Sequence, residues 1–256
     1  MTARRFGVVA LLLCLATHVL AATSYRVTIT TKGRLKRVPI VQRVIADGDR
    51  RRLTVEQQDE VFTFDVLLST DGGKTVTALN TPLRTWFDEA PLQAEKPARI
   101  PGLAEIKIQD AKTSVIEEPT DVTIAGFVTR KFVVRASYTS LEKYGDTKVK
   151  RLHAMTTLLW TTDKLDPSLA FPIRSITFGV EPLDAELRQK QAVISGFPLR
   201  RVTTISRAYE GGEPSVEITT HDVDDIRTVP SPAASEFVRP NGYANQEPII
   251  GVPGKS

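Results

Sequence analysis

The chain has 256 residues, with 34 Lys or Arg, 30 Asp or Glu and a single cysteine. Only Arg4 and Arg5 carry charge between positions 1 and 22, and without them 32 basic side chains face 30 acidic ones. A chain so close to neutral lacks the excess of basic residues typical of nucleic-acid binding, so no nucleic-acid partner is expected.

The segment 1–22 has the pattern of a secretory signal peptide. Two arginines precede an apolar run at residues 8–15, and small residues lead to a cleavage point after Ala21 or Ala22. We therefore expect a periplasmic or secreted protein. No later segment approaches the roughly 20 apolar residues of a spanning helix, so no transmembrane segment is expected.

Cys14 lies inside the predicted signal peptide, after the large residue Leu13, where a lipoprotein signal would need a small one. A lipid anchor on Cys14 is therefore not expected. Cleavage would leave no cysteine, hence no disulfide and no thiol nucleophile. A chain of this length buries enough surface for one core. We predict a single domain over residues 23–240 and a flexible tail over 241–256.

Alternation of apolar and polar residues with period two predicts strands along most of the chain. These strands lie near residues 25–30, 38–46, 51–55, 62–69, 76–79, 85–87, 106–108, 131–138, 149–160, 199–208 and 215–222. The strand at 149–160 has apolar residues on both faces, so another element should cover its second face.

Basic residues follow the first strand, and Lys32, Arg34 and Lys36 share one face if that strand continues. Two interpretations stand side by side. The cluster contacts anionic lipid head groups, or it is a solvated sheet face with lysines that protect an edge. The balance of charge over the whole chain favours the second.

The segment Ser69–Thr75, STDGGKT, ends like a phosphate-binding loop. Such a loop needs a glycine five residues before Gly73, because the chain must wrap the phosphates there. Leu68 occupies that position, and a β-prone run follows instead of a helix. The segment therefore predicts a hairpin turn at residues 71–73, where glycines supply positive φ angles.

Two helices are expected. Asp166-Pro167 is a cap and first-turn signal, and Pro172 stops that helix early. The longer helix lies at 184–194, with Asp184 as its cap and Gly196 as its end.

Neither of the two histidines after the predicted cleavage point indicates a catalytic or metal site. His153 lies within an apolar strand and is interpreted as a core histidine with a hydrogen bond. The segment 221–225, HDVDD, resembles a metal site in composition, but strand alternation would place His221 and Asp225 on one face and the other acids opposite. We predict no metal site, no catalytic residues, no cofactor and no enzyme activity.

Three motifs occur in order: I-x-G-x-x-T-R-K-aromatic at 124–132, S-G-x-P-L at 195–199 and F-x-x-P-x-G-Y at 237–243. Together they resemble an uncharacterised family of bacterial exported domains related to the lipoprotein carriers LolA and LolB. The resemblance spans residues 24–243. It implies a mainly β (α+β) fold, an open antiparallel half-barrel of about eleven strands with helices on its concave face, although a fold alone does not fix function.

The resemblance also implies a space between sheet and helices that takes acyl chains, although no cavity arginine of those carriers aligns with this chain. We expect a periplasmic carrier or sensor of a lipid-like ligand, with a lipid or acyl chain as its partner. The alternative is an envelope protein-interaction module with a filled core. The expected cavity-lining residues, from apolar strand faces, are Phe62, Phe64, Val66, Phe132, Val134 and Trp160.

Overall fold

The structure is a computed structural model, and it describes residues 21–33, 37–58, 64–89, 103–171 and 180–246. The N-terminal part of the chain runs through consecutive antiparallel strands. They are β1 (Ala21–Lys32), β2 (Ile40–Asp47), β3 (Arg50–Gln57), β4 (Val66–Ser69), β5 (Val76–Asn80) and β6 (Thr85–Glu89). The described turns from β2 to β3, from β4 to β5 and from β5 to β6 are short, as the breaks in the alternating pattern predict.

The second part of the chain has longer strands. They are β7 (Leu103–Glu118), β10 (Arg130–Tyr144), β11 (Thr147–Thr162), β12 (Phe197–Tyr209) and β13 (Ser215–Pro230), with a small separate hairpin of β8 (Thr123–Ile124) and β9 (Phe127–Val128). A last short strand, β14 (Ala244–Asn245), follows near the C-terminus. Tight turns connect β10 to β11 and β12 to β13, so each pair is a hairpin.

One large sheet contains twelve of the described strands, in the order β14-β6-β5-β4-β3-β2-β1-β13-β12-β11-β10-β7. All neighbours are antiparallel except β14 and β6. The two ends of this order do not pair, so the sheet is not closed into a barrel. A mainly β fold with an open, mostly antiparallel sheet is therefore confirmed, with twelve described strands where about eleven were expected.

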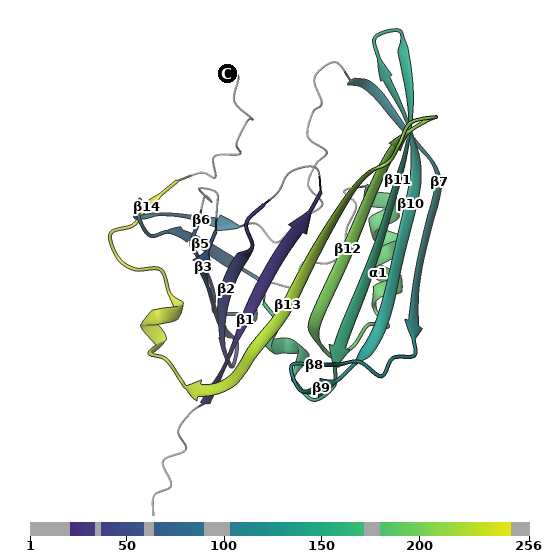
Figure 1. Ribbon diagram of the computed structural model, residues 1–256. Coiled ribbons are helices and arrows are strands. Elements are labelled where there is room, and N and C mark those ends of the chain that lie inside the picture. The colour runs from purple at the N-terminus through teal and green to yellow at the C-terminus, as the bar shows by residue number, and fades with distance from the viewer. Residues whose placement is uncertain (1–20, 34–36, 59–63, 90–102, 172–179, 247–256) are drawn as a thin grey trace, which may run out of the picture.

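The sheet has two halves that meet at β1 and β13 (Figure 1). Residues 21–32 of β1 pair with residues 218–230 of β13 on one side and with β2 on the other. In Figure 1 the strands from β2 to β6 turn away from the long ladder of β12, β11, β10 and β7. The seam thus joins the beginning of the described chain to its last long strand.

The helix α1 (Glu181–Gln191) lies behind the ladder of β10 to β12 in Figure 1. Its Leu183 and Leu187 are buried against four residues of the sheet. These are Val134, Ala136, Tyr138 and Met155. Each fully buried leucine contributes about 1.5–3 kcal/mol, so this contact fixes the helix on the sheet. Met155 belongs to the strand predicted to need a cover.

The ends of α1 differ from the prediction. Val180 is the N-cap, and Asp184 lies one turn inside, where its Oδ2 accepts a hydrogen bond of 3.0 Å from the Val180 N–H. The helix ends at Gln191 with Ala192 as its C-cap. The predicted end at Gly196 is wrong because that glycine lies in the entry to β12. The earlier helix is one 3-10 turn, η1 (Pro167–Leu169), capped by Asp166.

The segment STDGGKT is the turn between β4 and β5, so the predicted hairpin is confirmed. Ser69 Oγ accepts a hydrogen bond of 2.8 Å from the Gly73 N–H. Asp71 accepts from both the N–H and the hydroxyl of Thr75, and these bonds lower the pKa of Asp71 to about 2. The polar side chains of the segment therefore stabilise the turn itself.

Part of the segment 241–256, for which a flexible tail was predicted, forms the short strand β14. β14 pairs with β6, and the Ala244 and Gln246 N–H groups donate to backbone carbonyls of β6 and the turn before it. Tyr243 and Trp86 both pack against a small cluster of buried residues. Residues 247–256 lie outside the described residues. At the other end Ala21 and Ala22 belong to β1, so the sheet exceeds the predicted limits of 23–240 on both sides.

Candidate ligand-binding cavity

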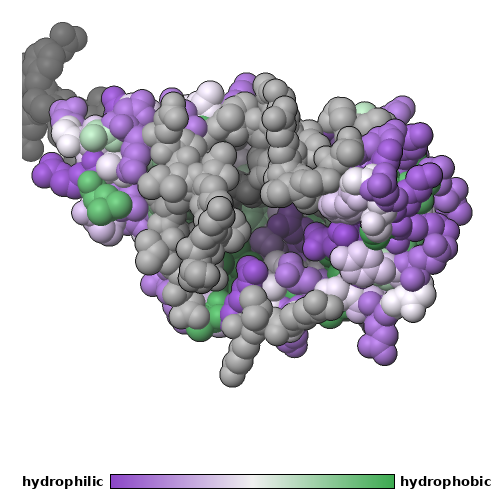
Figure 2. Space-filling view, turned by 90° about the horizontal axis from the view of Figure 1, so that it is seen from above, coloured by the Kyte–Doolittle hydropathy of each residue, from purple (hydrophilic) through white to green (hydrophobic). Residues whose placement is uncertain are grey.

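A cavity of about 760 Å³ lies beside the seam of the sheet. Its walls come from β1, β11, β12 and β13, from the η1 segment and from the chain between α1 and β12. The lining residues are Tyr25, Val27, Leu159, Thr161, Pro167, Ala170, Phe171, Arg188, Gln191, Ala192, Ile194, Ser195, Gly196, Phe197, Pro198, Leu199, Arg200, Arg201, His221 and Val223. Seen from above, the molecule is hollowed, and hydrophobic and hydrophilic residues both show in the recess (Figure 2).

The apolar wall of the cavity belongs to the largest core cluster. Tyr25, Phe171, Phe197 and Leu199 are buried members of that cluster, and Val27, Val223 and Ala170 pack against it. The rings of Tyr25 and Phe197 meet edge to face, with centroids 5.3 Å apart. Because the core holds these side chains in place, the apolar wall of the cavity is preformed.

Two buried side chains hold the η1 segment in place as one wall. The Tyr25 hydroxyl accepts a 2.8 Å hydrogen bond from the Phe171 N–H and donates one of 3.1 Å to the Leu169 carbonyl. Burial raises the pKa of Tyr25, so the hydroxyl stays protonated. Arg51, 1% exposed, donates from Nη2 to the Ser168 carbonyl at 2.6 Å. The wall is therefore anchored to β1 and β3 through its backbone.

The chain from Ser195 to Leu199 forms another wall, and each of its residues lines the cavity. Gly196 has a φ of +86°, and a Cβ there would lie 2.8 Å from the Thr162 carbonyl oxygen. Only glycine fits this close approach without a shift of the backbone. The adjacent Ser195 hydroxyl accepts a 2.8 Å hydrogen bond from Arg130 Nη1. This contact joins two of the three sequence motifs.

The polar part of the cavity is basic. Arg188, Arg200, Arg201 and His221 line it, whereas its described lining includes no Asp or Glu. Arg201 Nη2 lies 3.0 Å from His221 Nε2, and an arginine cannot accept, so this ring nitrogen accepts. Burial, reinforced by Arg201, lowers the pKa of His221 to about 3, which keeps the ring neutral at physiological pH.

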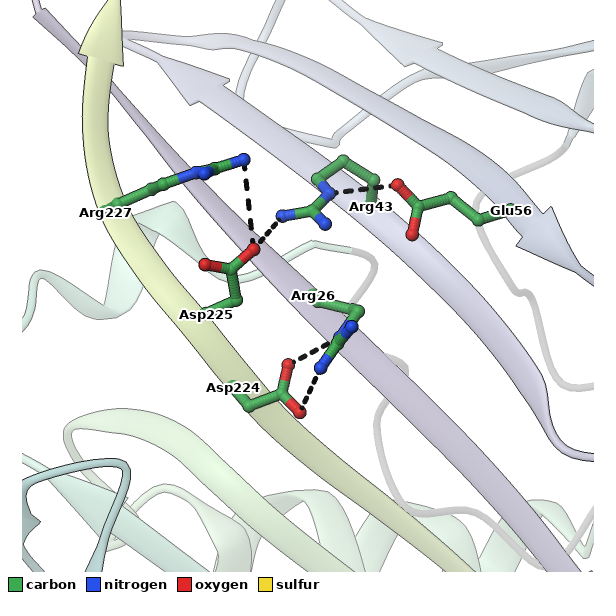
Figure 3. A network of polar contacts seen from close by, with 6 residues as sticks. All are labelled: Arg26, Arg43, Glu56, Asp224, Asp225 and Arg227. Carbon is green, nitrogen blue, oxygen red and sulfur yellow. Dashed lines mark hydrogen bonds and ion pairs between the residues drawn. The ribbon is translucent and has the colours of Figure 1, made fainter.

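Acidic residues of the same strands form ion pairs away from this lining. Asp224 of β13 binds Arg26 of β1 through two contacts, of 2.7 and 3.0 Å, and Asp225 binds Arg43 of β2 (Figure 3). Arg43 also contacts Glu56 at 3.0 Å. The acids of the segment 221–225 are thus paired with arginines, and among the described residues no three metal-ligating side chains come together.

The predicted cavity residues occupy other places. Val66 is buried with Leu68 and Leu79, Val134 is buried under α1, and Phe132 is 1% exposed in the interior. Phe64 and Trp160 pack against the largest core cluster. These five do not line the cavity, and Phe62 lies outside the described residues. Their role as ligand contacts remains a prediction.

A second polar cluster lies at the far end of the β10–β11 hairpin. Ser140 Oγ donates to Glu142 Oε1 at 2.9 Å and lies 3.0 Å from His153 Nε2, while His153 stacks on Tyr138 with centroids 4.4 Å apart. Since the hydroxyl proton goes to Glu142, His153 donates and does not act as a base toward Ser140. Ser140 and Glu142 are buried, so the cluster has the character of a core network.

The residues that sequence reasoning missed have a common origin. Arg201, His221 and Leu199 lie on strands that were predicted, but polar interruptions of an apolar face give no sign of a cavity in one sequence. The motif at 195–199 was the available signal, since it lines the cavity throughout.

No helix within the described residues has the length and apolar composition needed to cross a membrane. Neither family models nor curated proteins give a match to this chain.

Proposed function

We propose that this protein is a periplasmic carrier or sensor that holds a lipid-like hydrophobic ligand in the cavity beside the β1–β13 seam. The observation that carries the proposal is the cavity of about 760 Å³ between an apolar wall and a short helical segment. Ligand sites commonly have volumes of roughly 300–1,000 Å³ and a mainly apolar lining with few polar groups. The periplasmic location rests on the signal-peptide pattern of the segment 1–22.

The proposed architecture is a half-barrel like that of the LolA and LolB carriers, with α1 on its concave face. In that arrangement the sheet curls without closing, and α1 covers the part of it around Met155. The cavity lies where this cover stops, between residues 192–199 and η1. An apolar chain that enters there would bury about 0.8 kcal/mol per methylene group. The proposal includes no chemical reaction.

The alternative function is a module that binds an envelope protein through its surface and has a filled core. The cavity favours the ligand hypothesis, because a filled core would leave no such space next to Tyr25 and Phe197.

The test uses N-phenyl-1-naphthylamine, an uncharged probe that fluoresces in apolar surroundings. The chain without its predicted signal peptide is titrated, and saturable binding with one site per chain is expected. Val27→Trp should abolish binding because Val27 lines the cavity and a larger side chain would fill it. Val216→Trp is the matched control, since Val216 is exposed on β13, outside the lining.

Mass spectrometry of lipids extracted from natively purified protein supplies the second measurement. A co-purified lipid in the wild type that is absent from Val27→Trp would support the carrier. A folded wild type that neither binds the probe nor carries lipid would remove the proposal and leave the surface-binding module.

A further inference from the structure

The strand β7 is the long open edge of the sheet. It stands last in the strand order, and β10 is its one neighbour among the described strands. The opposite edge is β14, which has 2 residues, whereas β7 has 16. In Figure 1 β7 runs along the outer side of the ladder. A long edge presents backbone N–H and C=O groups to which a further strand can bind.

Irregular pairing divides this edge into two parts. The register of β7 with β10 shifts near Asp110, which has a φ of +52°, and shifts again close to the start of β7. Between these shifts, residues 105–109 pair regularly with residues 139–143 of β10. Because a bulge bends a strand and interrupts its ladder, a further strand can extend the sheet regularly only along 105–109 or beyond Asp110.

The part of the edge beyond Asp110 already has a partner in α1. Lys190 Nζ donates a 2.8 Å hydrogen bond to the Thr113 carbonyl, and the Thr113 hydroxyl donates to Glu186 Oε1 at 2.6 Å. The residues from 105 to 109 are all exposed, and within the described chain β10 alone bonds to their backbone. This short segment is therefore the accessible part of the edge.

The side chains of the segment are complementary to a second copy of themselves. Successive side chains of a strand alternate between faces, so Glu105 and Lys107 share one face and Ile106 lies on the other. Ile106 is 41% exposed, and Glu105 Oε1 lies 3.4 Å from Lys107 Nζ on the surface. If two copies pair in antiparallel fashion about a two-fold axis at Ile106, Ile106 faces Ile106 and each Glu105 faces a Lys107. Opposite charges in directly opposed positions stabilise a pair of strands.

Neighbouring registers lack this complementarity. A two-fold axis at Glu105 would place glutamate opposite glutamate, and an axis at Lys107 would place lysine opposite lysine, so both are disfavoured. An axis at Ile108 would bring the irregular position of Asp110 opposite Ile106. The sequence of the segment therefore specifies one register.

We propose that two copies of the protein form a dimer through β7, with antiparallel pairing and the two-fold axis at Ile106, so that the two sheets join into one. Such an interface uses the same edge of both copies and leaves only the short β14 at each end, so the assembly closes at two chains. The contact is small, and small interfaces form reversible complexes. The described lining of the cavity includes no residue of β7, so the dimer and the ligand hypothesis are independent.

Sedimentation velocity of the purified protein over a concentration series tests the proposal. The wild type is expected to shift from monomer to dimer as its concentration rises. Ile106→Lys should keep the protein monomeric, because two ammonium groups would meet at the axis. Ile116→Lys is the matched control, since Ile116 is a similarly exposed isoleucine of β7 outside the segment. It should dimerise like the wild type.

A charge exchange tests the register. Glu105→Lys alone and Lys107→Glu alone should each weaken dimerisation about tenfold or more, because like charges then face each other twice. An equimolar mixture of these two variants should form heterodimers about as well as the wild type dimerises, because every lysine again faces a glutamate. The double variant should also regain the wild-type association. These recoveries exclude a folding defect as the cause of the losses.

Each part of the proposal has its own contradicting result. A wild type that stays monomeric at every concentration would overturn the dimer. A dimer that persists in Ile106→Lys would overturn the assignment to β7, and loss of the dimer in Ile116→Lys would overturn its restriction to residues 105–109. A mixture of the two charge variants that remains monomeric would overturn the register.

Discussion

The ring of Phe171 lies against the backbone of Gly73, so closely that a Cβ on Gly73 would be 3.2 Å from Phe171 Cδ2. Phe171 lines the cavity, and Gly73 belongs to the turn between β4 and β5. The glycine-rich turn thus supports one wall of the cavity. This contact assigns a structural role to the segment Ser69–Thr75, whose sequence resembles a phosphate-binding loop.

Gly73→Ala should destabilise the protein by about 2–3 kcal/mol, because its φ of +90° disfavours a side chain and the new methyl group meets Phe171. Gly126→Ala is the matched control, with a φ of +84° and nothing within 4 Å of the added Cβ. Gly126→Ala should lower the free energy of unfolding by only about 1–2 kcal/mol, the cost of a positive φ for a residue with a Cβ. Urea denaturation measures both. Equal losses would mean that Phe171 moves aside without cost.

Tyr25→Phe should lower the free energy of unfolding by about 1–3 kcal/mol, because the buried Phe171 N–H and the Leu169 carbonyl both lose their partner. Tyr209→Phe provides the comparison. Tyr209 is exposed, and its hydroxyl accepts a hydrogen bond from Arg151. The free energy of unfolding should therefore change by no more than about 0.5 kcal/mol. If the two variants unfold at the same urea concentration, the anchor of η1 lies elsewhere.

Arg51→Met should be strongly destabilising, by about 2 kcal/mol or more, since the buried guanidinium donates to backbone carbonyls of Gly48, Arg50 and Ser168. The adjacent Arg52→Met removes a surface ion pair with Glu236 and should cost less than about 1 kcal/mol. Thermal and urea unfolding of the two variants test the difference. A reversed order would contradict the role given to Arg51.

Stability should fall as the pH is lowered below about 6.5, the ordinary pKa of histidine. The folded protein holds the pKa of His221 at about 3, so the unfolded chain binds the proton more readily. The stabilisation is present above about pH 6.5 and is lost as the pH falls toward 3, by up to about 1.4 kcal/mol per pH unit.

Urea midpoints at pH 7, 6 and 5 measure this effect in three proteins. His221→Gln should flatten the dependence while a side-chain oxygen still accepts from Arg201. His153→Gln should keep most of it, although burial lowers the pKa of His153 in the same direction. A His221→Gln protein with the slope of the wild type would exclude His221 as the titrating group.

The strands could be predicted because the alternation of apolar and polar residues depends only on neighbouring positions in the sequence. Phe132, Val134, Ala136 and Tyr138 are buried as the period of two requires, but Val133 between them is buried as well, which periodicity alone does not reveal. The bulge at Asp225 was missed for a related reason. Regular alternation placed Asp225 beside His221, whereas one extra residue on β13 turns it toward Arg43.

The position of the cavity could not be predicted from the hydrophobicity of the strand residues. The most apolar strand positions, such as Val66 and Val134, attract neighbours that bury them completely. A cavity forms where two connecting segments approach the sheet, and Arg201 and Phe171 both line it from positions distant in the chain. The ordered part of the tail was missed because β14 is held by Tyr243 packing and by pairing with β6.

The pairing of β1 with β13 sets the order in which the fold can be completed. Ala21 lies opposite Pro230, so almost the whole described chain separates the two partners. Pairing over such a separation is slow, because the closure entropy of the loop precedes any gain from contacts. Until residues 215–230 arrive, β1 and β12 each present an unpaired edge. The centre of the sheet is therefore assembled late, and a chain arrested before β13 would be prone to aggregate.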